Sequence, residues 1–329
     1  MNNNCAKSKR VLYIGPIFFH YDKRIVKKIQ ELKWDIDAFE IYPHINNIYF
    51  KIINKLNLSN VEESNRAYFN KILLKKNYDY VLVRHAQQLS VDFLKKLKDN
   101  NPNAKFVNFN WDSIRPEYDY LNTLDYYDKI YSFDYKDCQK HEKISYLPLF
   151  FVDEYLDFSK NSNNNLKQEF DLLFVGAWRD KERYQLIKAT QKLCKQDGLN
   201  FHYYLHFSYK AQFDSLKRGV TAKEARNKSL SHKDILKLFS VSNTIIDFPS
   251  SFQTGLTMRT FETLGSGKKL ITTNKNILTE PFYDPEYISV IDKNNLNLNI
   301  DFIKNVPNHP IQNKMENYSI ENYVNKLLL

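Results

Sequence analysis

The sequence predicts an α/β protein made of two successive Rossmann-like domains. Short runs of β-branched and aromatic residues alternate with longer amphipathic stretches, which is typical of parallel strands connected by helices. Along the 329 residues this alternation stops once, in a polar Asn-rich stretch, and then starts again. A chain of this length can bury a separate apolar core in each half. We therefore expect one domain over 1–157, a linker over 158–168 and a second domain over 169–314.

In the first half, short apolar runs bounded by polar or turn residues predict strands. These runs cover 10–15, 34–42, 79–84, 105–110, 128–133 and 144–149. Apolar residues at helical spacing predict helices over 22–32, 62–74 and 90–99. Ser90 is the predicted N-cap of the third helix, since a serine hydroxyl accepts a hydrogen bond from a free N–H group of the first turn.

The second half repeats this order. Strands are predicted over 170–176, 200–207, 243–248, 268–273 and 287–291. Helices are predicted over 181–195, 233–239 and 257–264, with Gly265 and Gly267 ending the last of them. The closing segment 315–329 is amphipathic, and we expect it to form a C-terminal helix that crosses back to the first domain.

Composition and cysteine usage indicate a soluble cytoplasmic protein. Hydrophobic residues make up 43% and charged residues 26%, which is the balance of a globular chain. Cys5, Cys138 and Cys194 are far apart without metal-ligand spacing, and they fit reduced thiols. The first residues lack the apolar core of a secretory signal. No run approaches the roughly 18–20 apolar residues that span a bilayer.

The positive charge of the chain is concentrated near its start. Of the formal net charge of +10, residues 1–76 supply a large share, with 14 Lys and Arg against 7 Asp and Glu. This excess indicates a face that meets an anionic membrane surface or a phosphate-bearing acceptor. Solvated helix faces in a Lys-rich chain are the alternative. Because no recognised nucleic-acid-binding motif accompanies the charge, we do not expect a nucleic-acid partner.

The loop after the strand that opens the second half is a candidate phosphate site. It begins at Gly176, continues as GAWRDKER and leads into a helix. In a parallel sheet, helix N-termini beyond the strand ends offer free N–H groups to anions. Gly176 allows close approach of a ligand, and the planar donor fork of Arg179 suits a phosphate. An ordinary turn with a surface arginine is the alternative.

A second candidate site lies in the segment 244–274. A strand breaks at a proline, passes through a loop of small residues and continues as a helix. The hydroxyls of Ser250, Thr254 and Thr257 can satisfy phosphate oxygens. Arg259 can neutralise their charge, and the Glu262 carboxylate matches the vicinal diol of a ribose. For Glu262 the alternative is a helix charge favoured by the macrodipole.

These segments resemble GT-B glycosyltransferases of the retaining group that builds bacterial surface polysaccharides. FETLGSGKKLITTN is similar to their helix ending, PSSFQTGL to their proline-serine loop, YLPLFFVDEY to their hinge and FDLLFVGAWRDKER to their donor-domain opening. Within the group the chain looks closest to lipopolysaccharide and capsule biosynthesis transferases related to the CgeB-like proteins. The motifs cover roughly 128–274. The resemblance implies two domains facing each other across a cleft, with a nucleotide-sugar donor held by the second.

The resemblance carries a ribose-binding glutamate over to Glu262. The first glutamate of the family pattern falls at Thr254, so other residues must share the diphosphate and sugar contacts. The full set expected to bind the donor is Gly176, Arg179, Ser250, Gln253, Thr254, Gly255, Thr257, Arg259 and Glu262.

On the acceptor side, the first strand ends at Gly15, where GT-B enzymes place an acceptor-facing loop. His20, with Asp22 nearby, is a candidate general base if the reaction inverts configuration. The alternative is an exposed loop histidine.

The next strand ends deliver further candidates. Arg84 and His85 follow one strand, and in the family a histidine at a corresponding strand end touches the donor sugar. Asp112 and Arg115 follow the next strand and are expected at the same edge of the sheet. For Asp112 the alternative is capping of a helix that begins near Pro116.

These observations lead to an expected function. The chain is expected to transfer a sugar from a nucleotide-sugar donor to a glycan or lipid-linked glycan at the inner face of the cytoplasmic membrane. Retention of configuration needs no classical nucleophile, and the lack of a DxD motif in a suitable setting favours a mechanism without metal. A GT-B nucleotide-sugar epimerase and a degenerate module that binds nucleotide sugar or anionic lipid stay open. No GxGxxG follows either opening strand, which disfavours a dinucleotide-dependent oxidoreductase.

Overall fold

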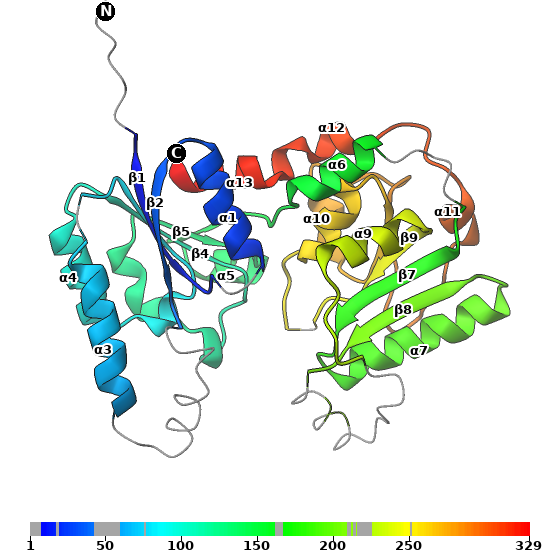
Figure 1. Ribbon diagram of the computed structural model, residues 1–329. Helices are drawn as coiled ribbons and strands as arrows, with labels where there is room; N and C mark the ends of the chain where they lie inside the picture. The colour runs from blue at the N-terminus through cyan, green and yellow to red at the C-terminus, as the bar shows by residue number, and fades with distance from the viewer. Residues whose placement is uncertain are drawn as a thin grey trace, which may run out of the picture. The chain divides into compact units, whose positions relative to one another are not determined.

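The computed structural model describes most of the chain as two compact units (Figure 1). The first unit comprises Met1–Leu147 together with Ile320–Leu329, and the second comprises Pro148–Ser319. The described residues are 8–17, 20–42, 60–75, 77–161, 167–208, 212, 215, 226–250 and 252–329. Among these residues, no helix combines the length and the apolar character needed to span a bilayer.

The first unit is built on a parallel sheet with the strand order β2-β1-β3-β4-β5-β6. Its strands are β1 (Arg10–Gly15), β2 (Asp35–Glu40), β3 (Tyr80–Val83), β4 (Lys105–Asn110), β5 (Lys129–Ser132) and β6 (Ile144–Tyr146). Its helices are α1 (His20–Glu31), α3 (Asn60–Leu73), η1 (Ala86–Gln88), α4 (Val91–Asn100), η2 (Pro116–Tyr118), η3 (Leu121–Tyr126), α5 (Tyr135–Lys140) and α13 (Ile320–Leu328).

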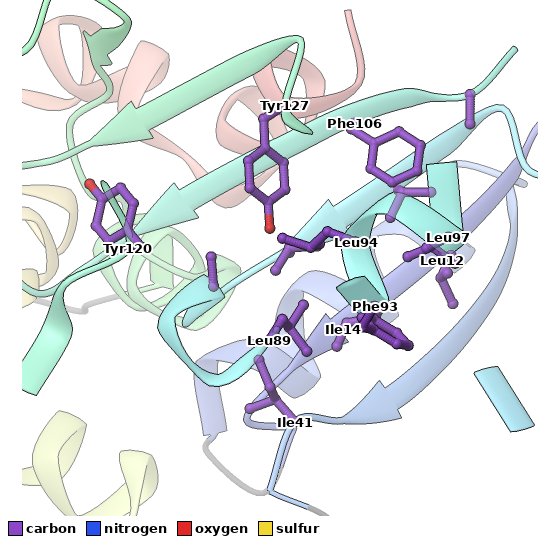
Figure 2. Close-up of a cluster of buried hydrophobic side chains, with 14 of the residues drawn as sticks. Leu12, Ile14, Ile41, Leu89, Phe93, Leu94, Leu97, Phe106, Tyr120 and Tyr127 are labelled. Atoms are coloured by element: carbon purple, nitrogen blue, oxygen red, sulfur yellow. The ribbon is translucent and has the colours of Figure 1, made fainter. Parts of the chain in front are cut away.

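Helices cover both faces of this sheet because its central strands β1, β3 and β4 are buried on both sides. On one face, Leu12 and Ile14 of β1 share a buried cluster with Phe93 and Leu94 of α4 (Figure 2). Neighbouring residues of a strand point to opposite faces, so Tyr13 belongs to the other face. There its hydroxyl donates to Asp22 of α1.

The chain end completes the first unit. Helix α13 lies beside α1 in Figure 1, with Val324 and Leu327 fully buried. The ring of Tyr323 lies 6.2 Å from the ring of Phe109 in β4. The expected return of the C-terminal helix to the first domain is therefore confirmed, although the helix begins at Ile320 and not at 315.

The second unit contains another parallel sheet, in the order β11-β10-β9-β7-β8. Its strands are β7 (Phe170–Ala177), β8 (Phe201–His206), β9 (Ser242–Asp247), β10 (Lys269–Thr272) and β11 (Ile288–Val290). Its helices are α6 (Asp153–Asn161), α7 (Lys181–Gln196), α9 (His232–Ser240), α10 (Met258–Gly265), η5 (Lys275–Thr279), α11 (Ile300–Lys304), α12 (Gln312–Met315) and η6 (Glu316–Tyr318).

One core of the second unit lies between the sheet and α7 and α11. There Leu172 and Phe174 of β7 are buried with Ile187 of α7 and Ile303 of α11. Helix α10 packs against β9, β10 and α6. It ends as the sequence predicts, because Gly267 adopts a left-handed φ of 74° directly after the helix.

The division between the units falls earlier than the sequence boundaries. The second unit begins at Pro148, whereas the first domain is expected to extend to Asp157. Part of the stretch expected as a linker is helical, since α6 runs to Asn161, and 162–166 lie outside the described residues. Just before this stretch, Tyr155 anchors α6, because it is fully buried and its ring lies 5.9 Å from that of Phe239.

Candidate functional site

A polar pocket of about 340 Å³ lies at the carboxyl ends of the strands in the second unit. Its walls are the loops after β9, β10 and β11 and the first turn of α7. This is the edge where doubly wound sheets bind ligands, because the loops diverge there and the helix N-termini point towards it. Three of the predicted donor residues line the pocket: Ser250, Gln253 and Thr254.

The loop that carries these residues is held by two asparagines. The side-chain amide of Asn274 donates to the carbonyls of Thr254 and Gly255, each at 3.1 Å. The Asn276 amide donates to the same Thr254 carbonyl at 2.8 Å. Both asparagines line the pocket, and Gly255 is buried beside it. The loop is therefore fixed through its backbone carbonyls, with Ser250 and Thr254 at the pocket wall.

Arg183 is a cation of this pocket that sequence reasoning missed. Asp180 caps α7 by accepting from the Arg183 backbone N–H at 2.7 Å, which places the arginine in the first helical turn. Its Nη1 donates to the Ala177 carbonyl at 3.1 Å, and burial lowers the pKa of Arg183. Its Nε is buried without a hydrogen-bond partner in the described part of the chain. Because Arg183 lines this polar pocket, its guanidinium suits an anion such as phosphate.

Thr257 has a structural role in this structure. Its hydroxyl accepts from the backbone N–H of Thr260 at 3.3 Å, which makes it the N-cap of α10. The same hydroxyl donates to the buried carboxylate of Asp247 at 2.5 Å. Thr257 does not line the pocket, so its hydroxyl stabilises the helix start that follows the loop.

Arg259 and Glu262 meet each other on α10. Arg259 Nη1 lies 2.6 Å from a carboxylate oxygen of Glu262, whose side chain is only 2% exposed. The guanidinium also lies over the Phe239 ring, at 5.4 Å from its centroid. Burial raises the pKa of Glu262 well above its ordinary value. Neither residue is part of the pocket lining.

The two remaining donor candidates lie at the end of β7. A Cβ at Gly176 would come within 2.8 Å of the Phe174 ring, so this glycine is explained by packing. Arg179 is exposed and is not part of the pocket lining. One turn of helix separates it from Arg183, which does face the pocket.

In the first unit, a buried ion pair connects helix α1 to the residue that follows β3. Arg84 and Asp22 are 3% and 0% exposed. Arg84 Nε and Nη2 donate to the two oxygens of Asp22, each at 2.7 Å. Burial opposes the charge of Arg84, but the Asp22 carboxylate outweighs it and raises the pKa of the guanidinium. Burial and the same carboxylate raise the pKa of Tyr13, whose hydroxyl also donates to Asp22.

His85 is held in the middle of this cluster. Its Nε2 lies 3.0 Å from Arg84 Nη1 and 3.4 Å from a carboxylate oxygen of Asp112. Its Nδ1 lies 2.9 Å from the hydroxyl of Tyr42. The backbone of His85 has a φ of 63°, a conformation that costs energy in a residue other than glycine and occurs often at functional sites. The structure thus brings Arg84, His85 and Asp112 together.

The capping alternative for Asp112 does not match the structure. The short helix near Pro116 is η2, and its N-cap position is occupied by Arg115. Arg115 itself is exposed, with its guanidinium stacked over Tyr118 at 4.7 Å and its Nε 3.5 Å from Glu117. It contacts the cluster only indirectly, since the Tyr118 ring lies 5.9 Å from the His85 ring.

His20 and Gly15 form contacts with residues other than His85. The expected pairing of His20 with Asp22 is replaced by the ion pair of Asp22 with Arg84. His20 begins α1, and its Nε2 accepts from Arg24 at 3.4 Å. A Cβ at Gly15 would come within 2.8 Å of the Tyr13 ring, which explains the glycine at the end of β1.

Acidic and imidazole groups do not converge on a metal site in the described ranges. Within them, no group of three or more His, Cys, Asp and Glu side chains is arranged to hold a metal ion.

Comparisons with known proteins reveal similarity in structure but not in sequence. No family model and no curated protein matches the chain. A solved α-glucosyltransferase, in complex with UDP and a 13-mer DNA containing a central A:G mismatch, is 10% identical, with a TM-score of 0.56 over 98% of this chain and 90% of that one. A putative UDP-N-acetylglucosamine 2-epimerase from Listeria monocytogenes is 12% identical, with a TM-score of 0.49 over 98% of this chain and 95% of that one. The α-glucosyltransferase, together with the two parallel sheets, shows that the chain has the GT-B fold.

Proposed function

We propose that the chain is a glycosyltransferase that takes a sugar from a nucleotide-sugar donor bound by its second unit. The observation that carries this proposal is the strand-end pocket, where Arg183 meets the loop of Ser250, Gln253 and Thr254. The pocket combines hydroxyls with a half-buried guanidinium. A diphosphate needs such donors, and removing its charge from water requires a cation close by.

In this proposal Arg183 supports the diphosphate that Arg179 was expected to bind. Glu262 stays the proposed ribose ligand on the strength of the family resemblance. The Glu262 carboxyl group contacts Arg259, and the hydroxyls of a ribose would donate hydrogen bonds to it beside, or in place of, that guanidinium. Positioning and charge neutralisation by these groups are what a retaining transfer without metal requires of a protein.

The first unit is proposed to serve the acceptor. The cluster around His85 and Asp112 presents imidazole, carboxylate and phenol groups at the strand ends, which are the groups that hydrogen-bond sugar hydroxyls. We propose a growing surface glycan of the lipopolysaccharide or capsule type as acceptor. The basic excess of 1–76 suits a lipid-linked acceptor at an anionic membrane surface.

Thermal unfolding with UDP, GDP, dTDP, CMP and ADP tests the donor site. A ligand that binds only the folded protein stabilises it by about 2.7 kcal/mol at a hundred times its Kd, so the matching nucleotide raises the Tm. Arg183→Gln should lose most of this increase. Lys195→Ala, which removes an exposed cation from the far end of the same helix, should keep it. If none of these nucleotides changes the Tm of the wild-type chain, the proposed donor site is wrong.

Incubation with sugar conjugates of the matching nucleotide then separates three activities. Transfer to an added glycan, or slow donor hydrolysis with retained configuration, supports the glycosyltransferase. Conversion of the donor to its epimer without any acceptor identifies an epimerase. Binding without turnover identifies a degenerate module.

A further inference from the structure

The C-terminal helix reaches into the cluster around His85 through a tyrosine. Tyr323 of α13 is 4% exposed, and its hydroxyl accepts a hydrogen bond from Trp111 Nε1 at 2.9 Å. The two residues are 212 positions apart in the chain. Trp111 directly follows β4, and Phe109 of that strand packs against both rings, at 6.0 Å from Trp111 and 6.2 Å from Tyr323.

Trp111 in turn forms a platform for Arg84. The Arg84 guanidinium lies over the indole face, with Cζ 4.2 Å from the ring centroid. A guanidinium stacked on an aromatic face is attracted by the ring electrons and is restricted to the plane parallel to that face. The hydrogen bond to Tyr323 restricts the two side-chain torsions of Trp111 and so fixes where the indole face lies. It therefore helps to set where the guanidinium lies.

Arg84 determines which nitrogen of His85 carries the proton. Its Nε and Nη2 are used by Asp22, and its Nη1 points to His85 Nε2 at 3.0 Å. Arginine only donates hydrogen bonds, so the 3.0 Å contact favours the form in which Nε2 accepts, whereas the Asp112 carboxylate at 3.4 Å from the same nitrogen favours a proton on it. Because the contact with Arg84 is the shorter one, we expect Nε2 to accept. In the neutral ring the proton is then on Nδ1, which donates to the Tyr42 hydroxyl at 2.9 Å.

We propose that Tyr323 is a positioning residue for His85. Acting through Trp111 and Arg84, the C-terminal helix holds the imidazole in its Nδ1–H form at the carboxyl end of β3. What His85 does in turnover rests on the proposed function, whereas its tautomer does not.

Nitrogen NMR of the histidine side chains in the full chain reads the tautomer directly. Loss of one signal set in His85→Gln assigns His85 among the 8 histidines. The wild-type ring should show a protonated Nδ1 and an unprotonated Nε2. Tyr323→Phe removes the acceptor but keeps the aromatic ring, and it should increase the Nε2–H population several-fold, the size expected for one hydrogen bond. Trp111→Phe removes the donor and should act in the same direction.

Tyr287→Phe is the matched control. Tyr287 is also buried and donates to the His309 carbonyl at 2.7 Å in the second unit. It should lower stability without changing the His85 signals. The proposal is overturned if wild-type His85 is protonated on Nε2, or if Tyr323→Phe and Trp111→Phe both leave its signals unchanged.

Kinetics add an independent reading once a donor is known. Tyr323→Phe should lower kcat several-fold while leaving KM for the donor unchanged, because the pocket of the second unit is untouched. If no nucleotide sugar is turned over, the proposed function fails but the NMR result still decides the role of Tyr323. A donor KM that rises with unchanged kcat contradicts positioning of His85.

Discussion

The carboxylate of Asp22 binds the Arg84 guanidinium at two points, with both Nε and Nη2 at 2.7 Å from its oxygens. Both side chains are almost completely buried. Removing one partner leaves the other charge in a place that water does not reach. Asp22→Asn should therefore destabilise the protein by about 3–5 kcal/mol.

The double variant Asp22→Leu/Arg84→Met separates the destabilisation caused by one unpaired buried charge from the net contribution of the ion pair to stability. It should be less destabilised than Asp22→Asn alone, because no unpaired charge is buried. Urea unfolding followed by circular dichroism gives the comparison. A double variant as unstable as the sum of its two single variants would show that the pairing does not matter.

The order of strands and helices could be predicted from the sequence because it depends on local patterns. The run at 170–176 became β7, and Ser90 caps α4 by accepting from the Phe93 N–H at 3.2 Å. Hydrophobic periodicity and capping act within a few residues. They need no knowledge of the tertiary structure.

Polar partners could not be predicted in the same way. Asp22 pairs with Arg84 across 62 positions, although His20 is the nearer candidate in sequence. Arg179 stands closer to the strand end than Arg183, but the cap at Asp180 sets the helical phase and turns Arg183 to the pocket. These polar contacts depend on how helices and strands pack together, and the local sequence pattern does not determine that packing.

Gly265 is predicted to tolerate no side chain. A Cβ at this position would lie 2.5 Å from Cγ of Phe151, a fully buried ring. Gly265→Ala should cost about 1–3 kcal/mol through overpacking, even though alanine favours helices. Phe151→Leu in the same chain should recover part of that loss, since it makes room. Equal Tm values for Gly265→Ala and wild type would mean that the ring moves away without cost.

Because of Lys268, part of the free energy of unfolding is predicted to increase with pH. Burial lowers its pKa to about 8, while its Nζ donates to the Ser242 carbonyl at 2.8 Å. The unfolded chain keeps an ordinary lysine pKa of about 10.4. Between these values the unfolded state binds more protons, so the contribution of Lys268 to stability rises as the pH increases from 8 towards 10.

Comparing the wild type with Lys268→Met isolates the contribution of Lys268, because the tyrosines that titrate at higher pH are present in both proteins. The stability of the wild type relative to the variant should increase across pH 8–10, by up to about 1.4 kcal/mol per pH unit. Denaturation midpoints measured in parallel give the difference. A constant difference across this range contradicts the lowered pKa.

The conformation of the pocket loop that carries Ser250, Gln253 and Thr254 is predicted to depend on Asn274. Its amide donates to the Thr254 and Gly255 carbonyls, and its side-chain oxygen accepts from the Asn276 N–H at 3.1 Å. Asn274→Ala removes these bonds, and each hydrogen bond contributes about 1 kcal/mol. The Kd of the matching nucleotide should therefore increase about five- to fiftyfold, because part of the binding free energy is then used to order the loop.

Two further variants distinguish loop ordering from a general loss of stability. Asn274→Asp would place a carboxylate oxygen against the two carbonyls and should weaken binding more than Asn274→Ala. Asn308→Ala removes an exposed amide that contacts Glu286 in the same unit and should bind nucleotide like the wild type. Isothermal titration measures all three. Equal affinities for the wild type and Asn274→Ala would mean that the loop keeps its conformation without the asparagine, and that the pocket is ordered by other contacts.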